Sequence, residues 1–231
     1  AGVSNTNGTI TSTVSANADA GFSIVSYTGN STGGATVGHG LTSKPDMIIT
    51  KQRSGVDSWG VYSSPLGATK MAYLNETGVP GTHLTYWNNT EPTSTLVTLG
   101  SDNKTNDSNP MIMYAFHSVE GYSKVGSYTG NGSADGTFVH CGFRPAYVMI
   151  KKTNAAGDWN IRDDARSPTN AVGDALYPNL SFVEYDGTET YLDFVSTGFK
   201  LRGNWNSSNA SGGTYIYIAF AEHPFKYTNA R

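Results

Sequence analysis

The feature that most constrains the fold is an internal repeat with an offset of about one hundred residues. The string Ser-Tyr-Thr-Gly-Asn occurs at residues 26–30 and again at 127–131. Further matches follow in the same order: 21–23 with 121–123, His39 with His140, 44–45 with 144–145, 47–49 with 148–150, Trp59 with Trp159, and 113–116 with 217–220. Ordered matches of this kind predict two copies of one structural unit. We place repeat 1 at residues 21–119 and repeat 2 at 120–231, and interpret residues 1–20 as a polar arm or the end of a preceding repeat.

Both copies have the local pattern of β-structure. Their apolar segments are short, rich in β-branched and aromatic residues, and separated by Gly, Asn, Asp or Pro. No apolar period of 3.6 residues extends over a useful length. We therefore expect an all-β fold of two tandem antiparallel β-sandwiches. The expected strands are 22–28, 46–53, 58–63, 70–75, 95–99 and 111–118, then 122–129, 137–142, 147–153, 158–163, 191–196, 198–202 and 214–222.

Composition excludes several classes of partner. Charged residues make up 14% of the chain, the formal net charge is −3, and Lys and Arg form no run. The chain therefore lacks the basic surface that would neutralise a nucleic-acid backbone. No apolar segment approaches the roughly 20 residues that span a bilayer, so membrane insertion is not expected. Cys141 is the only cysteine, which rules out an internal disulfide.

The repeated strings resemble a family of virion domains. GFSIVSYTGN, GYSKVGSYTGNGSADG and the closing TYIYIAFAEHPFKYTNAR are similar to tandem domains near the ends of tail-fibre and other virion proteins of marine and cyanobacterial phages. The resemblance implies a concanavalin- or laminin-G-like jelly roll in serial copies. It also implies an extracellular location on the virion, contacts with other virion proteins, and proximity to the host surface. It carries over no ligand or catalytic residue.

Catalysis is not expected. The chain has five histidines and many serines but no G-x-S-x-G elbow. We interpret His39 and His140 as a matched pair that forms hydrogen bonds within the fold. Glycoside hydrolysis would need two facing carboxylates. The candidates are Asp163 with Asp164, Asp186 with Glu184 and Glu189, and Asp193. Neighbours in an extended strand point to opposite faces, so Asp163 and Asp164 cannot face each other within a regular strand. A glycan depolymerase is thus a minor alternative, and we predict that the chain is not an enzyme.

A metal site is also disfavoured. Residues 101–107 offer several oxygen ligands of the type that calcium prefers, with Asp102 and Asp107 as weak candidates. Lys104 lies among them, and Asn and Asp favour turns for backbone reasons. We expect a solvated turn and no cofactor, with calcium left open.

The aromatic residues suggest where a ligand could bind. Trp59 and Trp159 match between copies and are expected to be buried in a shared core. Trp87 and Trp205 have no match, lie among amides and hydroxyls, and are expected to be partly exposed. An aromatic face with nearby amides suits a sugar. The candidate ligand-binding residues are Tyr86, Trp87, Asn88, Arg202, Asn204, Trp205 and Asn206, with Asp57 as a further hydrogen-bonding group.

Two functions follow from these observations. The first is a non-catalytic tail-fibre or virion module for host recognition, which binds a cell-surface glycan through its loops. The alternative is a purely structural spacer or decoration domain of the virion. Full burial of either Trp87 or Trp205 would favour the spacer.

Overall fold

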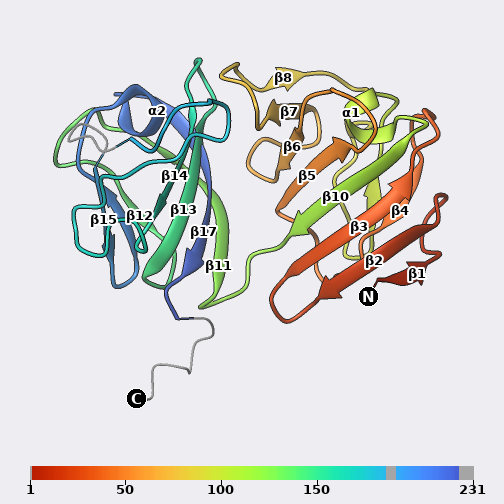
Figure 1. The fold of residues 1–231 in the computed structure, drawn as a ribbon, viewed down its shortest axis with the longest axis horizontal. Helices are drawn as coiled ribbons and strands as arrows, with labels where there is room; N and C mark the ends of the chain where they lie inside the picture. The colour runs from red at the N-terminus through yellow and green to blue at the C-terminus, as the bar shows by residue number, and fades with distance from the viewer. Residues whose placement is uncertain (1, 186–190, 224–231) are drawn as a thin grey trace. The chain divides into compact units, whose positions relative to one another are not determined.

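The computed structural model describes residues 2–185 and 191–223, and this part of the chain is nearly all β-structure, as expected. The chain divides into two compact units (Figure 1). The first contains residues 2–74 and 80–118, and the second contains 75–79 together with the described residues from 119 onward. Within the described ranges, no helix is long and apolar enough to cross a membrane.

The first unit is built on an eight-stranded antiparallel sheet with the order β1-β2-β3-β10-β5-β6-β7-β8. A two-stranded sheet, β4-β9, and one turn of helix, α1, complete it. The elements are β1 (Val3–Asn5), β2 (Ser12–Asn17), β3 (Phe22–Thr28), β4 (Thr36–Gly38), β5 (Met47–Gln52), β6 (Gly60–Ser63), β7 (Lys70–Tyr73), β8 (Gly81–Thr82), β9 (Leu96–Thr98), α1 (Asn103–Asn106) and β10 (Pro110–Phe116).

The core of the first unit lies between these two sheets. Alternation along β3 buries Val25, which faces Met113 of the neighbouring β10 in the strand register. From the smaller sheet, Val37 and Val97 pair across β4 and β9 and join the same apolar cluster. Two antiparallel sheets that share one core are the arrangement of a β-sandwich.

The second unit has a four-stranded antiparallel sheet, β11-β17-β13-β14, and a three-stranded sheet, β12-β16-β15. Val148 and Tyr217 from the first sheet and Phe199 from the second belong to one buried cluster. The elements are β11 (Ser123–Thr129), β12 (Phe138–His140), β13 (Pro145–Lys152), β14 (Trp159–Asp163), β15 (Leu192–Val195), β16 (Gly198–Leu201), α2 (Asn206–Asn209) and β17 (Thr214–Ala221).

Both units share one strand order. The order β3-β10-β5-β6 in the first corresponds to β11-β17-β13-β14 in the second. In each unit the last long strand lies between the first and the second strands of the matched set. Each unit also has a smaller sheet. In each, one helical turn comes shortly before the last long strand.

Register corrects the expected pairing of His39 with His140. The N–H groups of Leu99 and Leu201 donate to the carbonyls of Ala35 and Thr137, so these positions correspond. Counting forward, His39 corresponds to Cys141. Both are buried, whereas His140 is exposed. Because of the one-residue insertion before β12, His140 lies at the exposed end of that strand and Cys141 takes the core position.

His39 itself has the expected structural role. Its Nε2 lies 3.2 Å from the carbonyl oxygen of Thr93, and its Nδ1 accepts from the Leu41 N–H at 3.2 Å. Burial lowers the pKa of this imidazole, with the Thr93 carbonyl acting in the opposite direction. The neutral ring is suited to donate at one nitrogen and accept at the other.

The first twenty residues are not a separate arm. Residues 3–5 and 12–17 form β1 and β2, and β2 pairs with β3 over its whole length. Val14 is buried in the core of the first unit. The sequence did not indicate these strands because their outward side chains are polar, as is usual where one face of an antiparallel sheet is solvated.

Candidate functional site

The repeated Ser-Tyr-Thr-Gly-Asn string holds the helical turn of each unit in place. In the first unit, the Tyr27 hydroxyl donates to the Thr105 carbonyl at 2.6 Å, and the Asn30 N–H donates to Asn106 Oδ1 at 2.8 Å. Gly29 is required because a Cβ there would lie 2.0 Å from the carbonyl oxygen of Asp107. We call residues 29–32 and 100–107 the first corner.

A buried amide completes the first corner. Asn106 has no exposed surface, and its Nδ2 lies 2.8 Å from the Gly100 carbonyl, 2.9 Å from the Thr32 carbonyl and 3.2 Å from Asn30 Oδ1. These contacts join three loop segments through one side chain. Leaving such a buried amide without partners would be costly, so the corner is rigidly specified.

The second unit repeats this arrangement in its own corner, residues 130–133 and 203–210. Asn209 is also fully buried, and its Nδ2 lies 2.6 Å from the Gly203 carbonyl, 2.9 Å from the Ser133 carbonyl and 3.1 Å from Asn131 Oδ1. The Asn131 N–H donates to Asn209 Oδ1 at 3.0 Å. The two corners thus share the same pattern of hydrogen bonds. The units differ in the other side chains of the corners.

Sequence reasoning missed Asn106 and Asn209, although a signal for them exists. The pattern Asn-x-Ser/Thr-Asn occurs at 103–106 and at 206–209. In a chain so rich in Asn, Ser and Thr this pattern does not stand out. Only the shared position, just before the last long strand of each unit, distinguishes it.

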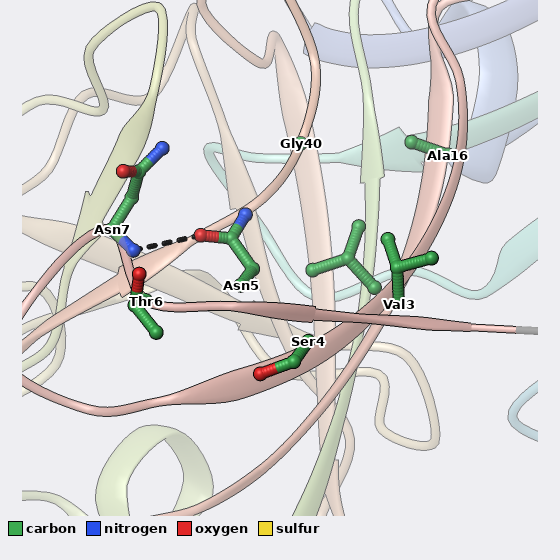
Figure 2. Close-up of a pocket in the computed structure, with 8 residues that line it drawn as sticks. Val3, Ser4, Asn5, Thr6, Asn7, Ala16 and Gly40 are labelled. Atoms are coloured by element: carbon green, nitrogen blue, oxygen red, sulfur yellow. Dashed lines mark hydrogen bonds between the residues drawn. The ribbon is translucent and has the colours of Figure 1, made fainter.

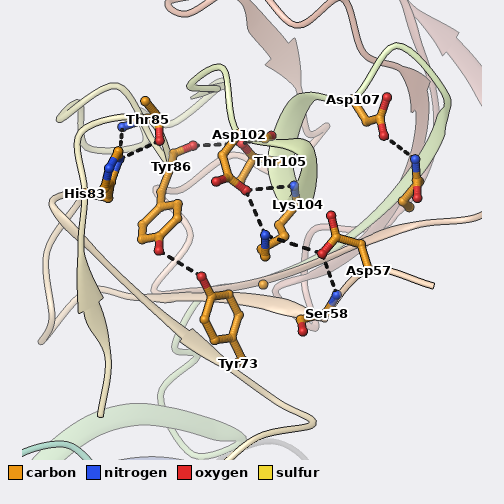
Figure 3. A network of polar contacts seen from close by, with 12 residues as sticks. Asp57, Ser58, Tyr73, His83, Thr85, Tyr86, Asp102, Lys104, Thr105 and Asp107 are labelled. Atoms are coloured by element: carbon orange, nitrogen blue, oxygen red, sulfur yellow. Dashed lines mark hydrogen bonds and ion pairs between the residues drawn. The ribbon is translucent and has the colours of Figure 1, made fainter. Parts of the chain in front are cut away.

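A polar and aromatic network lies beside the first corner (Figure 3). Lys104 Nζ lies 3.3 Å from Asp57 Oδ1, 3.6 Å from Asp102 Oδ1 and 5.8 Å from the centre of the Tyr73 ring. Burial acts to lower the pKa of Lys104, but the charges of Asp102 and Asp57 outweigh it and raise the pKa. The ammonium is therefore held by its neighbours and is not an available base.

Tyr86, one of the predicted ligand-binding residues, belongs to this network. Its hydroxyl lies 2.8 Å from the hydroxyl of Tyr73, and the two rings meet edge to face at 6.4 Å. His83 lies on its other side, with Nδ1 2.7 Å from Thr85 Oγ1. Tyr86 is half-buried, so its ring and hydroxyl serve mainly to join β7 to the 83–86 loop.

Trp87 is not exposed, contrary to the prediction. Its side chain is 1% exposed, meets Tyr62 edge to face at 5.7 Å, and belongs to the core of the first unit. The following residues, Asn88 and Asn89, have φ of 51° and 50°. This left-handed turn lets the indole point inward while Asn88 stays exposed. Amide neighbours therefore indicated the turn, and not a binding surface.

The calcium candidates take part in the loop structure. Asp102 caps α1 by accepting from the Lys104 N–H at 2.9 Å, and it also lies beside the Lys104 ammonium. Asp107 accepts hydrogen bonds from Gln52 and Asn109. No group of three His, Cys, Asp or Glu side chains in the described residues could hold a metal ion. An ammonium beside a carboxylate opposes a cation site there.

The second corner has a different set of side chains. Trp205 stands where Asp102 stands in the first corner, as the residue before the helical turn, but makes no side-chain capping bond. Its half-buried indole meets Tyr177 edge to face at 5.9 Å, and the Arg162 guanidinium lies 5.9 Å from its ring. Tyr177 in turn contacts Tyr185 at 6.4 Å.

Other predicted residues surround this cluster. Arg202 makes a two-pronged ion pair with Asp193, through Nε at 2.6 Å and Nη2 at 2.5 Å. Asn206 accepts from Lys152 Nζ at 2.6 Å and donates to the Ala156 carbonyl at 3.1 Å. Asn204 is exposed. Arg202, Asn204 and Asn206 are exposed and Trp205 is half-buried, and Arg202 and Asn206 also hold neighbouring segments through their contacts.

The hydrolytic candidates in the described part of the chain are each paired with an arginine, whereas Asp186 and Glu189 lie outside the described residues. Asp164 Oδ2 lies 3.9 Å from Arg144 Nη1. Asp163 accepts from the Arg166 backbone N–H and pairs with its guanidinium, which also binds Glu184. Asp193 is held by Arg202. These carboxylates are therefore engaged in ion pairs within the second unit.

A hollow of about 370 Å³ lies beside β1 (Figure 2). The hydrogen bond from the Asn7 N–H to Asn5 Oδ1, at 2.8 Å, shapes one side of it. It contains none of the predicted ligand-binding residues. Its lining residues are uncharged and small: Val3, Ser4, Asn5, Thr6, Asn7, Val14, Ala16 and Gly40.

These features define an all-β protein whose two units each hold one loop corner by a buried asparagine. Residues 1–224 match a family described as a domain of unknown function, DUF7483. Because this match spans nearly the whole chain, the chain belongs to that family. No curated protein and no solved structure matches it.

Proposed function

We propose that the chain is a non-catalytic structural module that acts as a rigid spacer in a larger extracellular assembly. The observation that supports this most is the matched set of contacts around Asn106 and Asn209. Two units that differ widely in sequence keep the same buried hydrogen-bonding plan. Such a plan specifies a rigid loop and offers no reacting group.

A second matched feature points the same way. Lys51 Nζ donates to the carbonyls of Gln52 and Gly55 at 2.8 and 2.7 Å, and closes the turn after β5. Lys151 Nζ donates to the carbonyls of Thr77 and Gly157, at 3.0 and 2.8 Å, after β13. Each unit thus uses a lysine to satisfy loop carbonyls, which stabilises the loop that follows β5 in one unit and β13 in the other.

The setting follows from the resemblance to tail-fibre domains. A virion protein with serial jelly-roll copies would contact other virion proteins and face the host cell. The low charge of the chain suits such an exposed, weakly interacting surface. We place the spacer before glycan recognition because the burial of Trp87 removes one of the two expected aromatic platforms.

Stretching the intact chain between its ends in a force spectrometer tests the proposal. A spacer should show two discrete unfolding events, one for each unit. Asn106→Ala should weaken one event and Asn209→Ala the other, because each leaves buried carbonyls without a donor. The exposed Asn204→Ala serves as the control and should weaken neither event.

Extension without discrete events would contradict the structural role. A parallel assay addresses catalysis, with reducing ends released from lipopolysaccharide or capsule as the readout. We expect none. Release that is lost in Asp163→Ala or Asp193→Ala would favour the depolymerase instead.

A further inference from the structure

The second corner departs from the first at a position where local stability favours a capping residue. Asp, Asn, Ser or Thr before a helical turn contributes about 0.5–2 kcal/mol relative to a residue that cannot cap. Asp102 makes this bond, while Trp205 makes none. A residue that breaks a local preference on an otherwise shared scaffold is expected to serve something other than folding.

Arg162 and Tyr177 contact the Trp205 ring and leave it partly exposed to solvent. Arg162 is 1% exposed and lies against the indole, and its guanidinium also forms a hydrogen bond with Tyr177. Burial lowers the pKa of Arg162 to about 10, so the group stays charged near neutral pH. A cation against one part of an indole fixes the ring by cation–π attraction.

Polar groups lie in the segments that adjoin Trp205. The Asp158 N–H donates at 3.0 Å to the Oγ of Ser207, two residues after Trp205, and Asp158 Oδ1 accepts from Asn179 at 2.8 Å. Asn204, the residue before Trp205, is exposed. Tyr185, which contacts Tyr177, is 41% exposed. The cluster therefore combines a fixed aromatic face with amide, carboxylate and phenol groups.

We propose that Trp205, Tyr177 and the adjacent polar groups form a carbohydrate-binding site in the second unit, which stacks the C–H face of a neutral sugar ring on the indole. Sugars pair such apolar faces with hydroxyls that need hydrogen-bonding partners. The first corner has Asp102 in place of this indole. The intact chain therefore binds one such sugar, and the structural role does not depend on this site.

The test uses the intact chain on an array of neutral hexose and N-acetylhexosamine oligosaccharides, followed by calorimetric titration of the best binder. We expect one site per chain. Trp205→Ser should weaken binding tenfold or more while leaving the unfolding midpoint unchanged or higher, because Ser is a good capping residue. Trp205→Phe should keep part of the affinity, since it keeps an aromatic face.

The matched control is Asp102→Ser, which places the same residue at the equivalent position of the first corner. It should leave binding unchanged. The proposal is wrong if no oligosaccharide on the array binds the intact chain, or if Trp205→Ser binds as the parent does. Either result would leave the force measurements and the spacer role untouched.

Discussion

Tyr27 and Thr105 are joined by a hydrogen bond of 2.6 Å, from a buried phenol to a carbonyl of the helical turn. Tyr128 and Ser208 repeat this contact at 2.7 Å in the second unit. Burial raises the pKa of both phenols, so they remain protonated donors.

The first prediction concerns these phenols. Tyr27→Phe and Tyr128→Phe each keep the ring but leave a carbonyl without its donor. Each should lower the free energy of unfolding of its own unit by about 1–3 kcal/mol. Urea unfolding, with hydrogen exchange to assign the transition to one unit, measures the effect. Equal stability of parent and variants would show that the contact is not a structural pin.

A second prediction reverses what the flanking residues of Trp87 suggested. Because the indole fills the core of the first unit, Trp87→Ala should destabilise that unit by about 3–5 kcal/mol, as Trp159→Ala should destabilise the second. Trp205→Ala, at a half-buried position, should cost clearly less. A midpoint for Trp87→Ala close to that of the parent would contradict the burial.

Every strand expected from the sequence corresponds to an observed one, to within a few residues at each end. The expected 22–28 is β3, and the expected 147–153 and 214–222 overlap β13 and β17. These segments combine β-branched or aromatic residues with clear turn signals. Local residue types are therefore enough to indicate them.

The elements that were missed lack that signal. β2 buries only Ser12 and Val14, and backbone pairing with β3 holds it. The helical turns α1 and α2 contain only polar residues and depend on Asn106 and Asn209. Such elements form because of contacts between segments that are distant in the sequence, and no local sequence pattern indicates these contacts.

The same limit applied to the tryptophans. Trp159 is buried, but its partner Trp59 is only half-buried. A match between the two copies thus indicated which residues occupy equivalent positions, but not how deeply each side chain is buried. At Trp87, the Asn88-Asn89 turn decided the direction of the side chain, which flanking residue types do not encode.

Cys141 gives a third prediction, on chemical reactivity. Its thiol is buried, and burial raises its pKa to about 12. Because the thiolate is the reactive form, the native chain should react with a disulfide reagent at neutral pH at least a hundredfold more slowly than the urea-unfolded chain. Fast native labelling would show that the second unit opens locally.

The last prediction concerns the pH dependence of the second unit, in which Lys151 and Cys141 act in opposite directions. Burial lowers the pKa of Lys151 to about 8, partly countered by Asp158. Above that pH the folded state has lost a proton that the unfolded lysine still holds, so stability rises with pH towards about 10. Cys141 acts the other way, because its thiol ionises first in the unfolded state.

Magnitudes decide the balance between pH 7 and 9.5. The Lys151 contribution should rise by about 2 kcal/mol over this window, while that of Cys141 should fall by about 1 kcal/mol. Burial also raises the pKa of Tyr128, Tyr147 and Tyr217, which offsets part of the Lys151 gain as the pH approaches 10. Relative to the change in the parent over this window, Cys141→Ala should therefore gain about 1 kcal/mol more and Lys151→Met should gain about 2 kcal/mol less. Urea unfolding at both pH values, with pulse labelling of the β13 and β17 amides at a fixed pH, provides the measurement. If Lys151→Met followed the parent curve, the buried ammonium would not be the group that titrates.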